Sequence, residues 1–409
     1  NAEFVGDERQ HFGHTNRGVI DADVDGCRGG SHGQQVDCGG SGVVATELAH
    51  ALAYRGHDIH LISAELPFRW RWGTPGLTFE RVDTPSYPLF NEPQYLLALT
   101  NTLVKVSRRH KLDIIHAHYA VPHATAAYLA HDILASESER PPRTVTTLHG
   151  TDITLVGSDP SFASVVAFSI ESSDGVTAVS ESLRRDTQTA LGVRRDIEVI
   201  PNFLECSEYH RLNDTSLRER LCAQEGCQAI VMHISNFRPV KRVGAVVEIF
   251  RRIREQVRAR LVMVGDGPDR LAAERQAAAC GLSDYVDFVG EQHDVVAWLS
   301  AADLFLLPSA QESFGLAALE AMSCEVPVIA SRVGGLPEVI QDGVTGYICD
   351  PDDIEGMAQR GIELLRNDAL RQRIGRAARN DVARRFCTDI VVPRYEQFYE
   401  DVLAGRVHR

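Results

Sequence analysis

Two acidic residues, Glu312 and Glu320, lie eight positions apart around the sequence Ser313-Phe314-Gly315-Leu316. An apolar run precedes them, so we expect Glu312 just before a helix and Glu320 about two turns inside it. Carboxylates in these positions can accept hydrogen bonds from separate hydroxyls of one extended ligand. Gly315 would keep the helix N-terminus open to a phosphate, whose charge the helix dipole favours. The segment therefore predicts a site for a ligand that carries both hydroxyls and phosphate.

A second segment, Ser235-Asn236-Phe237-Arg238-Pro239-Val240-Lys241-Arg242, follows another apolar run. It places three cations within five residues at the predicted end of a strand. Arginine can bind phosphate as a planar fork and lysine as a point charge. On a surface loop these cations would only be solvated. In a chain with a net charge of −14, a basic cluster beside a cleft favours a clamp for a diphosphate. Such a clamp could replace Mg²⁺ as the stabiliser of a leaving group.

Histidines follow two more apolar runs. His149-Gly150-Thr151-Asp152 follows Thr144–Leu148, and His116-Ala117-His118-Tyr119 ends an earlier run, with His123 close behind. We expect His116 and His118 to point to opposite faces of their strand and therefore not to share a metal ion. Hydrogen bonding to a polar substrate is favoured over metal binding, and a purely structural role stays open.

Glycines also precede a predicted helix, in Gly39-Gly40-Ser41-Gly42 before Val43–Tyr54. They would let backbone N–H groups approach an anion at a helix N-terminus. A tight turn without any ligand explains the pattern equally well. The spacing does not fit a G-x-G-x-x-G fingerprint, and the sequence lacks a G-x-x-x-x-G-K-[ST] loop, which argues against a nucleotide triphosphatase.

The elements that must position these residues are short apolar runs that alternate with helix-length amphipathic segments. Such runs are typical of parallel sheets covered on both faces. Two series of them predict an α/β protein with two doubly wound domains and a ligand site in the cleft between the domains. The predicted strands are Asp58–Ser63, Asp113–Ala117, Thr144–Leu148, Gly175–Val179, Ile197–Ile200, Ala229–Ile234, Arg260–Val264, Val286–Val289, Leu304–Leu307, Val326–Ala330 and Gly346–Cys349.

We place the domain boundary after Pro201-Asn202-Phe203, which gives an N-terminal domain over 39–205 and a C-terminal domain over 206–409. The last helix is expected to pack back on the N-terminal domain. Residues 1–38 are atypical, because a chain of this type should open with an apolar strand that leads into the first glycine loop. Either Gly18–Val24 supplies a weak first strand, or the segment is a tag, a fusion or mistranslated sequence.

Composition limits the partners. The 409 residues include 42 Lys and Arg against 56 Asp and Glu, which disfavours binding to nucleic acid and to anionic membranes. The longest apolar stretches are strand-sized, and the start of the sequence shows no signal peptide. The nine cysteines lack C-x-x-C spacing, which predicts reduced thiols and neither a disulfide frame nor a zinc site. A cytoplasmic protein without stable membrane insertion is therefore expected, and a homodimer stays open.

Together the motifs resemble a known family. E-S-F-G-L-x-x-L-E-A-M followed by V-P-V-I-A-S-x-V-G-G-L-P-E-V-I is similar to the retaining GT-B glycosyltransferases of the sucrose-synthase-like family, family 4. One subgroup makes N-acetyl-α-D-glucosaminyl L-malate in the first step of bacillithiol biosynthesis. The segments that resemble it are G-G-S-G-V-V-A-T-E-L, H-A-H-Y-A-V-P-H-A, T-T-L-H-G-T-D-I-T-L-V-G-S-D-P, S-N-F-R-P-V-K-R and L-V-M-V-G-D-G-P. The resemblance runs from about Gly39 to about Tyr399.

The resemblance implies transfer of N-acetylglucosamine from UDP-GlcNAc to the hydroxyl of L-malate, with retention and without a metal cofactor. Glu320 would hold the ribose and Glu312 the sugar, while Lys241 and Arg238 neutralise the diphosphate. His149 would contact the sugar near its anomeric centre. The remaining donor-binding residues would be Gly40, Ser41, Gly42, Asn236, Phe314, Gly315 and Leu316, and the acceptor side would comprise Ser41, Tyr119 and Thr151.

Three positions depart from the family pattern. Asn236 stands where the family usually has Arg, Glu325 where it has Gly, and Ala167 where the subgroup tends to have a basic residue. The loss of that basic residue leaves the carboxylate clamp for malate open, with Arg69, Arg71 and Lys105 as candidate replacements. One alternative is a related transferase with a lipid or polysaccharide acceptor, for which the Phe68–Trp72 segment would be a membrane face. Another is a UDP-sugar epimerase, or a UDP-sugar-binding protein inactivated by its N-terminus.

Overall fold

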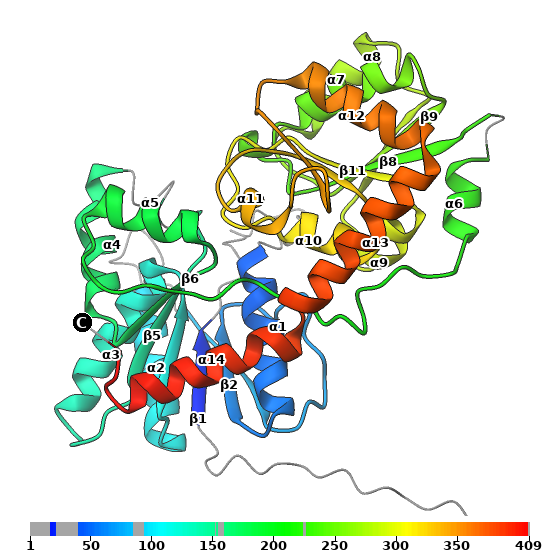
Figure 1. The fold of residues 1–409 in the computed structure, drawn as a ribbon. Coiled ribbons are helices and arrows are strands. Elements are labelled where there is room, and N and C mark those ends of the chain that lie inside the picture. Colours follow the sequence, from blue (N-terminus) through cyan, green and yellow to red (C-terminus); the bar gives the residue numbers. More distant parts are fainter. Residues whose placement is uncertain are drawn as a thin grey trace, which may run out of the picture.

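The structure, a computed structural model, describes residues 17–21, 40–84, 94–151, 153, 159–223 and 226–407. These residues form two parallel sheets with helices on both faces of each (Figure 1). The strand order is β3-β2-β1-β4-β5-β6-β7 in the first sheet and β10-β9-β8-β11-β12-β13 in the second. Both orders reverse beside the first strand of the sheet, β1 or β8, which is the doubly wound arrangement. The predicted fold class of two Rossmann-like α/β domains is confirmed.

The first sheet consists of short strands, and all its pairs are parallel. They are β1 (Arg17–Asp21), β2 (Asp58–Ser63), β3 (Leu77–Arg81), β4 (Ile114–His118), β5 (Arg143–Leu148), β6 (Gly175–Ala178) and β7 (Glu198–Val199). The helices of this part are α1 (Gly40–Tyr54), α2 (Tyr95–His110), α3 (Thr125–Ala135), α4 (Pro160–Ser172) and α5 (Glu181–Leu191), with a π-helical turn η1 (Ala120–Ala124) before α3.

The second sheet is likewise parallel. Its strands are β8 (Ala229–Ile234), β9 (Ala259–Val264), β10 (Val286–Gly290), β11 (Leu304–Leu307), β12 (Val328–Ser331) and β13 (Gly346–Cys349). Its helices are α6 (Ser216–Leu221), α7 (Val243–Arg254), α8 (Arg270–Ala279), α9 (Val295–Ala301), α10 (Leu316–Ser323), α11 (Leu336–Val339), α12 (Ile354–Arg366) and α13 (Asp368–Arg385), with a 3₁₀ turn η3 (Pro239–Lys241); α14 (Thr388–Leu403) ends the chain's regular structure.

Strand β1 is an interior strand of the first sheet. It pairs with β2 on one side and β4 on the other, and Val19 and Ile20 are buried. The segment 1–38 therefore contributes a strand that overlaps the predicted Gly18–Val24 region, although the rest of that segment lies outside the described residues. The domain boundaries themselves, after residues 38 and 205, stay predictions.

Strand β3 was not predicted from the sequence. It lies at the edge of the sheet and alternates polar and apolar residues, with only Leu77 fully buried. A strand of this kind lacks the continuous apolar run by which the other strands were recognised.

Helix α14 returns to the first sheet after α13 of the second domain (Figure 1). Its Val391, Val392 and Tyr395 share a buried cluster with residues of α1 and β2. Because this helix belongs to the core of the first sheet, the end of the chain links both domains. Among the described residues, no helix has the length and apolarity that crossing a bilayer requires.

The prediction that the cysteines are reduced thiols is wrong for two pairs. Cys206 is bonded to Cys387, and Cys222 is bonded to Cys227. The first pair forms because the segment before α14 lies beside the chain that leaves the first domain, where Leu204 and Cys387 form a bridge. Partners that are 181 residues apart leave no signal in sequence spacing.

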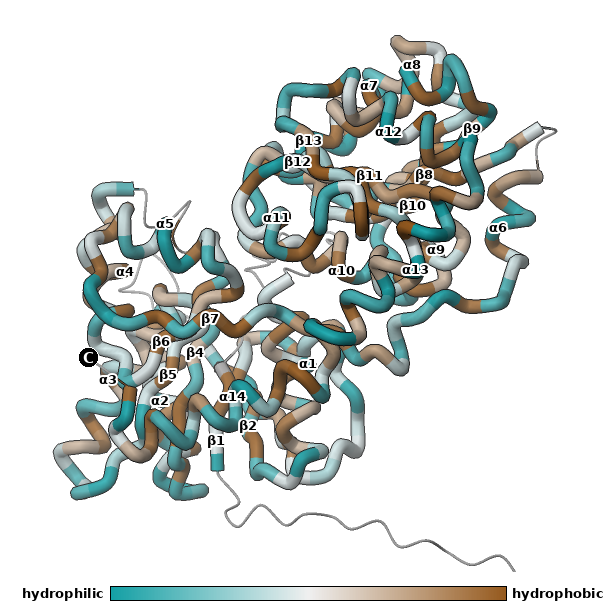
Figure 2. Tube along the Cα trace, in the orientation of Figure 1, coloured by the Kyte–Doolittle hydropathy of each residue, from teal (hydrophilic) through white to brown (hydrophobic). Residues whose placement is uncertain are grey.

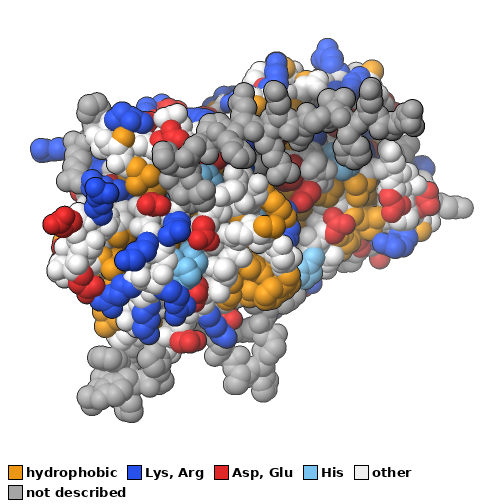
Figure 3. Space-filling model, turned by 90° about the horizontal axis from the view of Figure 1, so that it is seen from below, with side chains coloured by type: hydrophobic (Ala, Val, Ile, Leu, Met, Phe, Trp, Pro, Cys, Tyr) orange, Lys and Arg blue, Asp and Glu red, His pale blue; other side chains and the backbone are white. Residues whose placement is uncertain are grey.

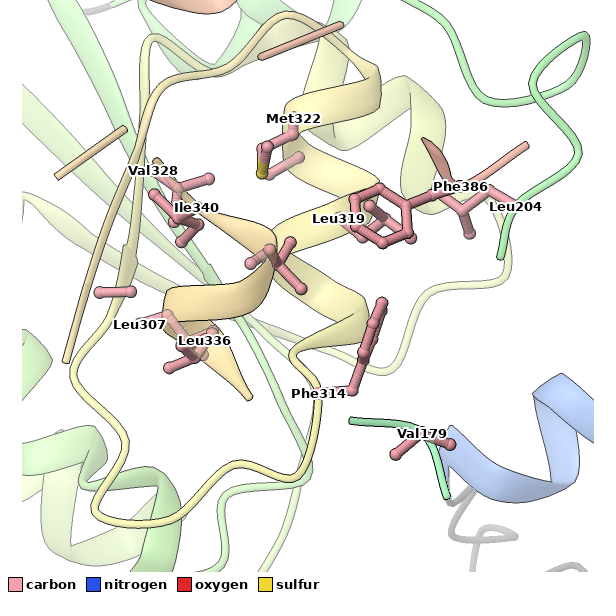
Figure 4. Packing of buried hydrophobic residues seen from close by; sticks show 14 of the residues in the cluster. Val179, Leu204, Leu307, Phe314, Leu319, Met322, Val328, Leu336, Ile340 and Phe386 are labelled. Carbon is pink, nitrogen blue, oxygen red and sulfur yellow. The ribbon is translucent and has the colours of Figure 1, made fainter. Parts of the chain in front are cut away.

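The apolar core follows the strands of both sheets, as the hydropathy colours show (Figure 2). One cluster joins the two domains, because Val179 after β6 and Phe314 before α10 belong to it together (Figure 4). The Phe314 ring lies edge-on to that of Phe386, with centroids 5.7 Å apart and an interplanar angle of 78°. This packing anchors the loop that carries Glu312.

Candidate active site

Two adjoining cavities lie at the cleft between the domains. The Glu320 cavity has a volume of about 240 Å³ and includes Glu320, Asp266 and Gln292. The His149 cavity has a volume of about 510 Å³ and includes His149 and Thr151. The two cavities are contiguous, because five residues line both of them: Gly40, Asn236, Lys241, Glu312 and Leu316. Because both domains contribute walls, one extended ligand can occupy the two cavities together.

Most of the predicted site residues line these cavities. The His149 cavity is lined by Gly40, Ser41, Tyr119, His149, Thr151, Asn236, Arg238, Lys241, Glu312, Phe314, Gly315 and Leu316. Gly42 is buried inside α1, where its carbonyl accepts a hydrogen bond from Thr46 Oγ1 at 2.7 Å, and it lines neither cavity. Gly39 and Asp152 lie outside the described residues.

The basic segment after β8 divides into two parts. Lys241, at the end of η3, forms an ion pair with Glu312, with Nζ 2.6 Å from Oε2. Arg238 also reaches the His149 cavity. Arg242 instead turns toward Asp352, 3.2 Å away, and lines neither cavity. The predicted three-cation clamp therefore reduces to Arg238 and Lys241.

Glycine turns bring Glu312 close to the start of α10. Gly334 has φ 51°, and a Cβ at this position would lie 1.9 Å from the carbonyl oxygen of Glu312. The N–H of Gly335 donates to the same oxygen at 2.9 Å. Gly315 precedes α10 with φ 101°, a conformation that side-chain-bearing residues rarely adopt. The N-terminal N–H groups of α10 are thereby available to an anion.

Glu320 is almost fully buried in α10 and already has a cationic partner. Its Oε1 lies 3.0 Å from Nη2 of Arg69, which comes from the loop between β2 and β3 of the other domain. Phe68, next to Arg69, stacks on His293 with ring centroids 4.4 Å apart. Both Phe68 and Arg69 line the Glu320 cavity, a role that the sequence did not predict.

The suggested membrane face at Phe68–Trp72 is therefore turned largely into the molecule. Phe68 and Arg69 contact the second domain, and Trp70 packs against the core of the first sheet. Trp72 is 79% exposed, and its ring lies edge-on to that of Trp70, with centroids 5.9 Å apart. The sequence alone could not distinguish an outward from an inward orientation of this alternating pattern.

The histidines after β4 and β5 form one buried network. His118 Nδ1 lies 2.8 Å from His149 Nε2, and the ring centroids of His116 and His118 are 4.5 Å apart. The expectation that His116 and His118 point to opposite faces is wrong, because residues two apart on a strand share a face. Tyr399 of α14 hydrogen-bonds to His116 Nδ1 at 2.8 Å, so the returning helix supports this network.

Burial makes the His149 ring neutral. Burial is the largest cause that lowers the pKa of His149 to about 3, and the nearby His123 lowers it further. Burial also lowers the pKa of His116 to about 3. At neutral pH the His149 imidazole can therefore donate or accept a hydrogen bond, but it carries no proton to release as an acid.

The wall that α1 shares with the end of β4 is polar. Ser41 Oγ is hydrogen-bonded to the hydroxyl of Tyr119, whose backbone has φ 95°. Asn202 and Asn236 each have a buried Oδ1 without a hydrogen-bond partner. Because buried polar atoms are normally paired, these two oxygens indicate ligand contacts. Asn202 was not predicted from the sequence as a site residue.

The candidate replacements for the missing basic residue lie elsewhere. Arg69 pairs with Glu320, Arg71 pairs with Glu47 and Glu208, and Lys105 is exposed on α2. None of the three lines the His149 cavity. Ala167 on α4 packs against the apolar cluster of the domain.

Sequence and structural comparisons identify the class. The model described as Glycosyltransferase Family 4 matches residues 38–208, and the model described as Glycosyl transferases group 1 matches residues 223–381. These two matches, together with a curated relative that is 45% identical over 89% of this chain, show that the chain belongs to this family of glycosyltransferases and is an enzyme of that class.

Two curated relatives extend over most of the chain. N-acetyl-alpha-D-glucosaminyl L-malate synthase of Bacillus anthracis is 45% identical over 365 residues, which cover 89% of this chain and 94% of the relative. A D-inositol 3-phosphate glycosyltransferase of Acidothermus cellulolyticus is 29% identical over 416 residues, which cover 90% of this chain and 87% of the relative.

Solved structures confirm the GT-B fold. Sucrose-phosphate synthase of Thermosynechococcus elongatus superposes with a TM-score of 0.78 at 21% identity, covering 96% of this chain and all of the other. Anabaena Alr3699/HepE in complex with UDP-glucose superposes with a TM-score of 0.75 at 20% identity, covering 95% of this chain and all of the other.

Proposed function

We propose that this glycosyltransferase moves N-acetylglucosamine from UDP-GlcNAc to the hydroxyl of L-malate, with retention of the anomeric configuration. The observation that carries the proposal is the 45% identity to the Bacillus anthracis synthase across 89% of the chain. In this function the enzyme carries out the first step of bacillithiol biosynthesis. The cytoplasmic location, the homodimer and the lack of a nucleic-acid partner stay predictions.

On the donor side, Glu320 accepts hydrogen bonds from the ribose hydroxyls of UDP in the Glu320 cavity. The ion pair between Glu320 and Arg69 supports this assignment indirectly. It indicates that the buried carboxylate of Glu320 is ionised and can accept hydrogen bonds from a ligand in the cavity. Arg69 must then share Glu320 with the nucleotide or move aside. The sugar extends from there toward Glu312, which adjoins both cavities.

The reaction proceeds on one face of the sugar. The bond between the anomeric carbon and the β-phosphate oxygen breaks, and a bond from the malate hydroxyl oxygen to the same carbon forms. The hydroxyl proton passes to an oxygen of the departing diphosphate. Lys241, Arg238 and the N-terminus of α10 stabilise the negative charge that develops on this group, without a metal ion.

On the acceptor side, Ser41, Tyr119 and Thr151 surround the malate. A neutral His149 positions the sugar by hydrogen bonding, in agreement with the lowered pKa. Arg238 and Lys241 are the cations among the described residues that line this cavity, so we assign the carboxylates of malate to their neighbourhood. Positioning and electrostatics then supply most of the catalysis.

The test is UDP release from UDP-GlcNAc in EDTA, measured with L-malate and, as a control, with succinate, which lacks the hydroxyl. We expect release with malate only, and an α-linked product by NMR. Binding of UDP without malate-dependent release would refute the acceptor assignment. Loss of release in EDTA that Mg²⁺ restores would refute the metal-free mechanism.

A further inference from the structure

A second group of potential ligands lies in the first domain outside the cavities described above. His60 of β2, Glu80 of β3 and His110 at the end of α2 each offer one ligand atom, and these three atoms lie within 4.8 Å of one another. We call this group the His60 cluster. Two imidazole nitrogens and one carboxylate oxygen are ligands that Zn²⁺ commonly takes.

The His60 side chain is oriented as a metal-binding histidine would be. It is 2% exposed, and its Nδ1 lies 2.6 Å from Thr78 Oγ1. Its Nε2 is buried and has no hydrogen-bond partner. Metal-bound histidines typically hold one ring nitrogen with a neighbouring polar group and present the other nitrogen to the ion. A buried nitrogen without a partner is otherwise unfavourable, so the geometry itself indicates a missing ligand.

The charges around the cluster suit a divalent cation. Asp58 Oδ1 lies 3.9 Å from His60 Nε2 and can supply a fourth ligand. Arg109 lies 3.6 Å from Glu80, so a metal ion would compete with this weak ion pair. The two carboxylates and the one guanidinium leave a net negative charge around the imidazoles.

The cluster lies away from the catalytic cleft. His110 ends α2 just before β4 begins, so it is at the amino end of the parallel strands, whereas the cleft is at their carboxyl ends. Figure 3 views the molecule from below, on the side of the lower end of β1 in Figure 1, and shows many Lys and Arg side chains on that face. A metal ion here would hold α2 to the edge of the sheet and would take no part in glycosyl transfer.

We propose that His60, Glu80 and His110, with Asp58 as a fourth ligand, form a structural site for a divalent transition-metal ion of the Zn²⁺ class. The sequence prediction of no metal ligands considered only the histidines near the cleft. The spacing of residues 60, 80 and 110 has no recognisable ligand pattern, because three different elements bring them together.

Zn²⁺ titration of chelator-treated protein tests the proposal. We expect one tightly bound Zn²⁺ per chain and a rise in Tm of about 5 °C. His110→Ala, at the end of a helix, should weaken Zn²⁺ binding more than about 100-fold and abolish the rise in Tm. Glu80→Gln should weaken binding in the same direction while keeping the shape of the side chain. His210→Ala, which removes an exposed histidine, is the matched control and should bind Zn²⁺ as the unmodified chain does.

Two further measurements distinguish this site from the histidines of the cleft. Co²⁺ should give a visible spectrum of a four-coordinate nitrogen and oxygen site that is lost in His110→Ala and kept in His149→Asn. Malate-dependent UDP release should be unchanged in His110→Ala and Glu80→Gln. The proposal is overturned if the chain binds no more Zn²⁺ than His110→Ala does, or if Zn²⁺ is lost only in His149→Asn.

Discussion

The two halves of the cleft hold their polar groups in different ways. The half formed by the second domain holds its carboxylates in charged pairs, Glu312 with Lys241 of the same domain and Glu320 with Arg69 of the first domain. The half formed by the first domain uses neutral hydrogen bonds, such as those between His118 and His149 and between Ser41 and Tyr119.

The difference shows what each half must do. The carboxylates of the charged half already have cationic partners before a ligand binds, so a charged donor must compete with these ion pairs. The neutral half keeps its rings uncharged by burial and is ordered before the acceptor arrives. The charged pairs suit the stabilisation of charge that develops on the leaving group during the reaction. The neutral hydrogen bonds suit the orientation of the sugar and the acceptor.

The largest effect, on kcat, should follow from removing the Lys241–Glu312 ion pair of the charged half. Lys241→Ala removes the cation beside the proposed leaving group and leaves Glu312 without its partner, so kcat should fall by about 10²–10³-fold. Steady-state kinetics with UDP-GlcNAc measure this. Arg242→Ala is the matched control, because Arg242 lines neither cavity and should cost less than about threefold. Equal losses in both variants would contradict the assignment of the clamp.

The next largest effect should be a loss of folding stability at low pH, caused by the buried histidines of the neutral half. The folded pKa values of His116 and His149 are about 3, below the unfolded value near 6.5, so the unfolded chain binds more protons between these values. Stability is therefore complete above about pH 7 and falls as the pH is lowered, by up to about 1.4 kcal/mol per pH unit for each histidine.

Urea unfolding between pH 7 and 5 measures this loss. His149→Asn should flatten the slope by up to one proton, whereas His210→Asn, at an exposed position, should leave it unchanged. A stability that is constant over this range would contradict the buried neutral network.

A smaller effect, on the affinity for UDP, should follow from breaking the other ion pair of the charged half. Arg69→Ala frees Glu320 from its cationic partner, so UDP should bind about tenfold more tightly, with a loss of folding stability because the buried carboxylate loses its compensating charge. Calorimetric titration with UDP measures the affinity. Arg71→Ala, which breaks ion pairs outside both cavities, should leave UDP affinity unchanged. Weaker binding to Arg69→Ala would mean that Arg69 itself contacts the nucleotide.

The smallest effect concerns one neutral hydrogen bond. Tyr119→Phe removes the hydroxyl that pairs with Ser41 and should raise the KM for malate by up to about tenfold, since one neutral hydrogen bond contributes about 1 kcal/mol. The affinity for UDP should stay the same. Tyr128→Phe, in α3 outside both cavities, serves as the control. A change in UDP affinity alone would place Tyr119 on the donor side.

The sequence by itself determined the fold class, most of the strands and the loops that line the cleft. Strands such as β8 and β11 are continuous apolar runs, so local pattern sufficed to locate them. Gly315 could be recognised as the residue that opens a helix beside the site, and its positive φ angle is one that favours glycine. These features depend on neighbouring residues along the chain.

Tertiary structure alone decided the contacts between distant segments. Arg69 reaches Glu320 across 251 positions, Cys206 bonds with Cys387 across 181, and His116 meets Tyr399 across 283. Glu325 adopts φ 59° after α10, a conformation that residues with side chains rarely adopt. Side-chain direction, partner and burial at these positions depend on how the two sheets and α14 pack. A local sequence pattern specifies on which face of a helix or strand a residue lies, but not which distant segment packs against that face.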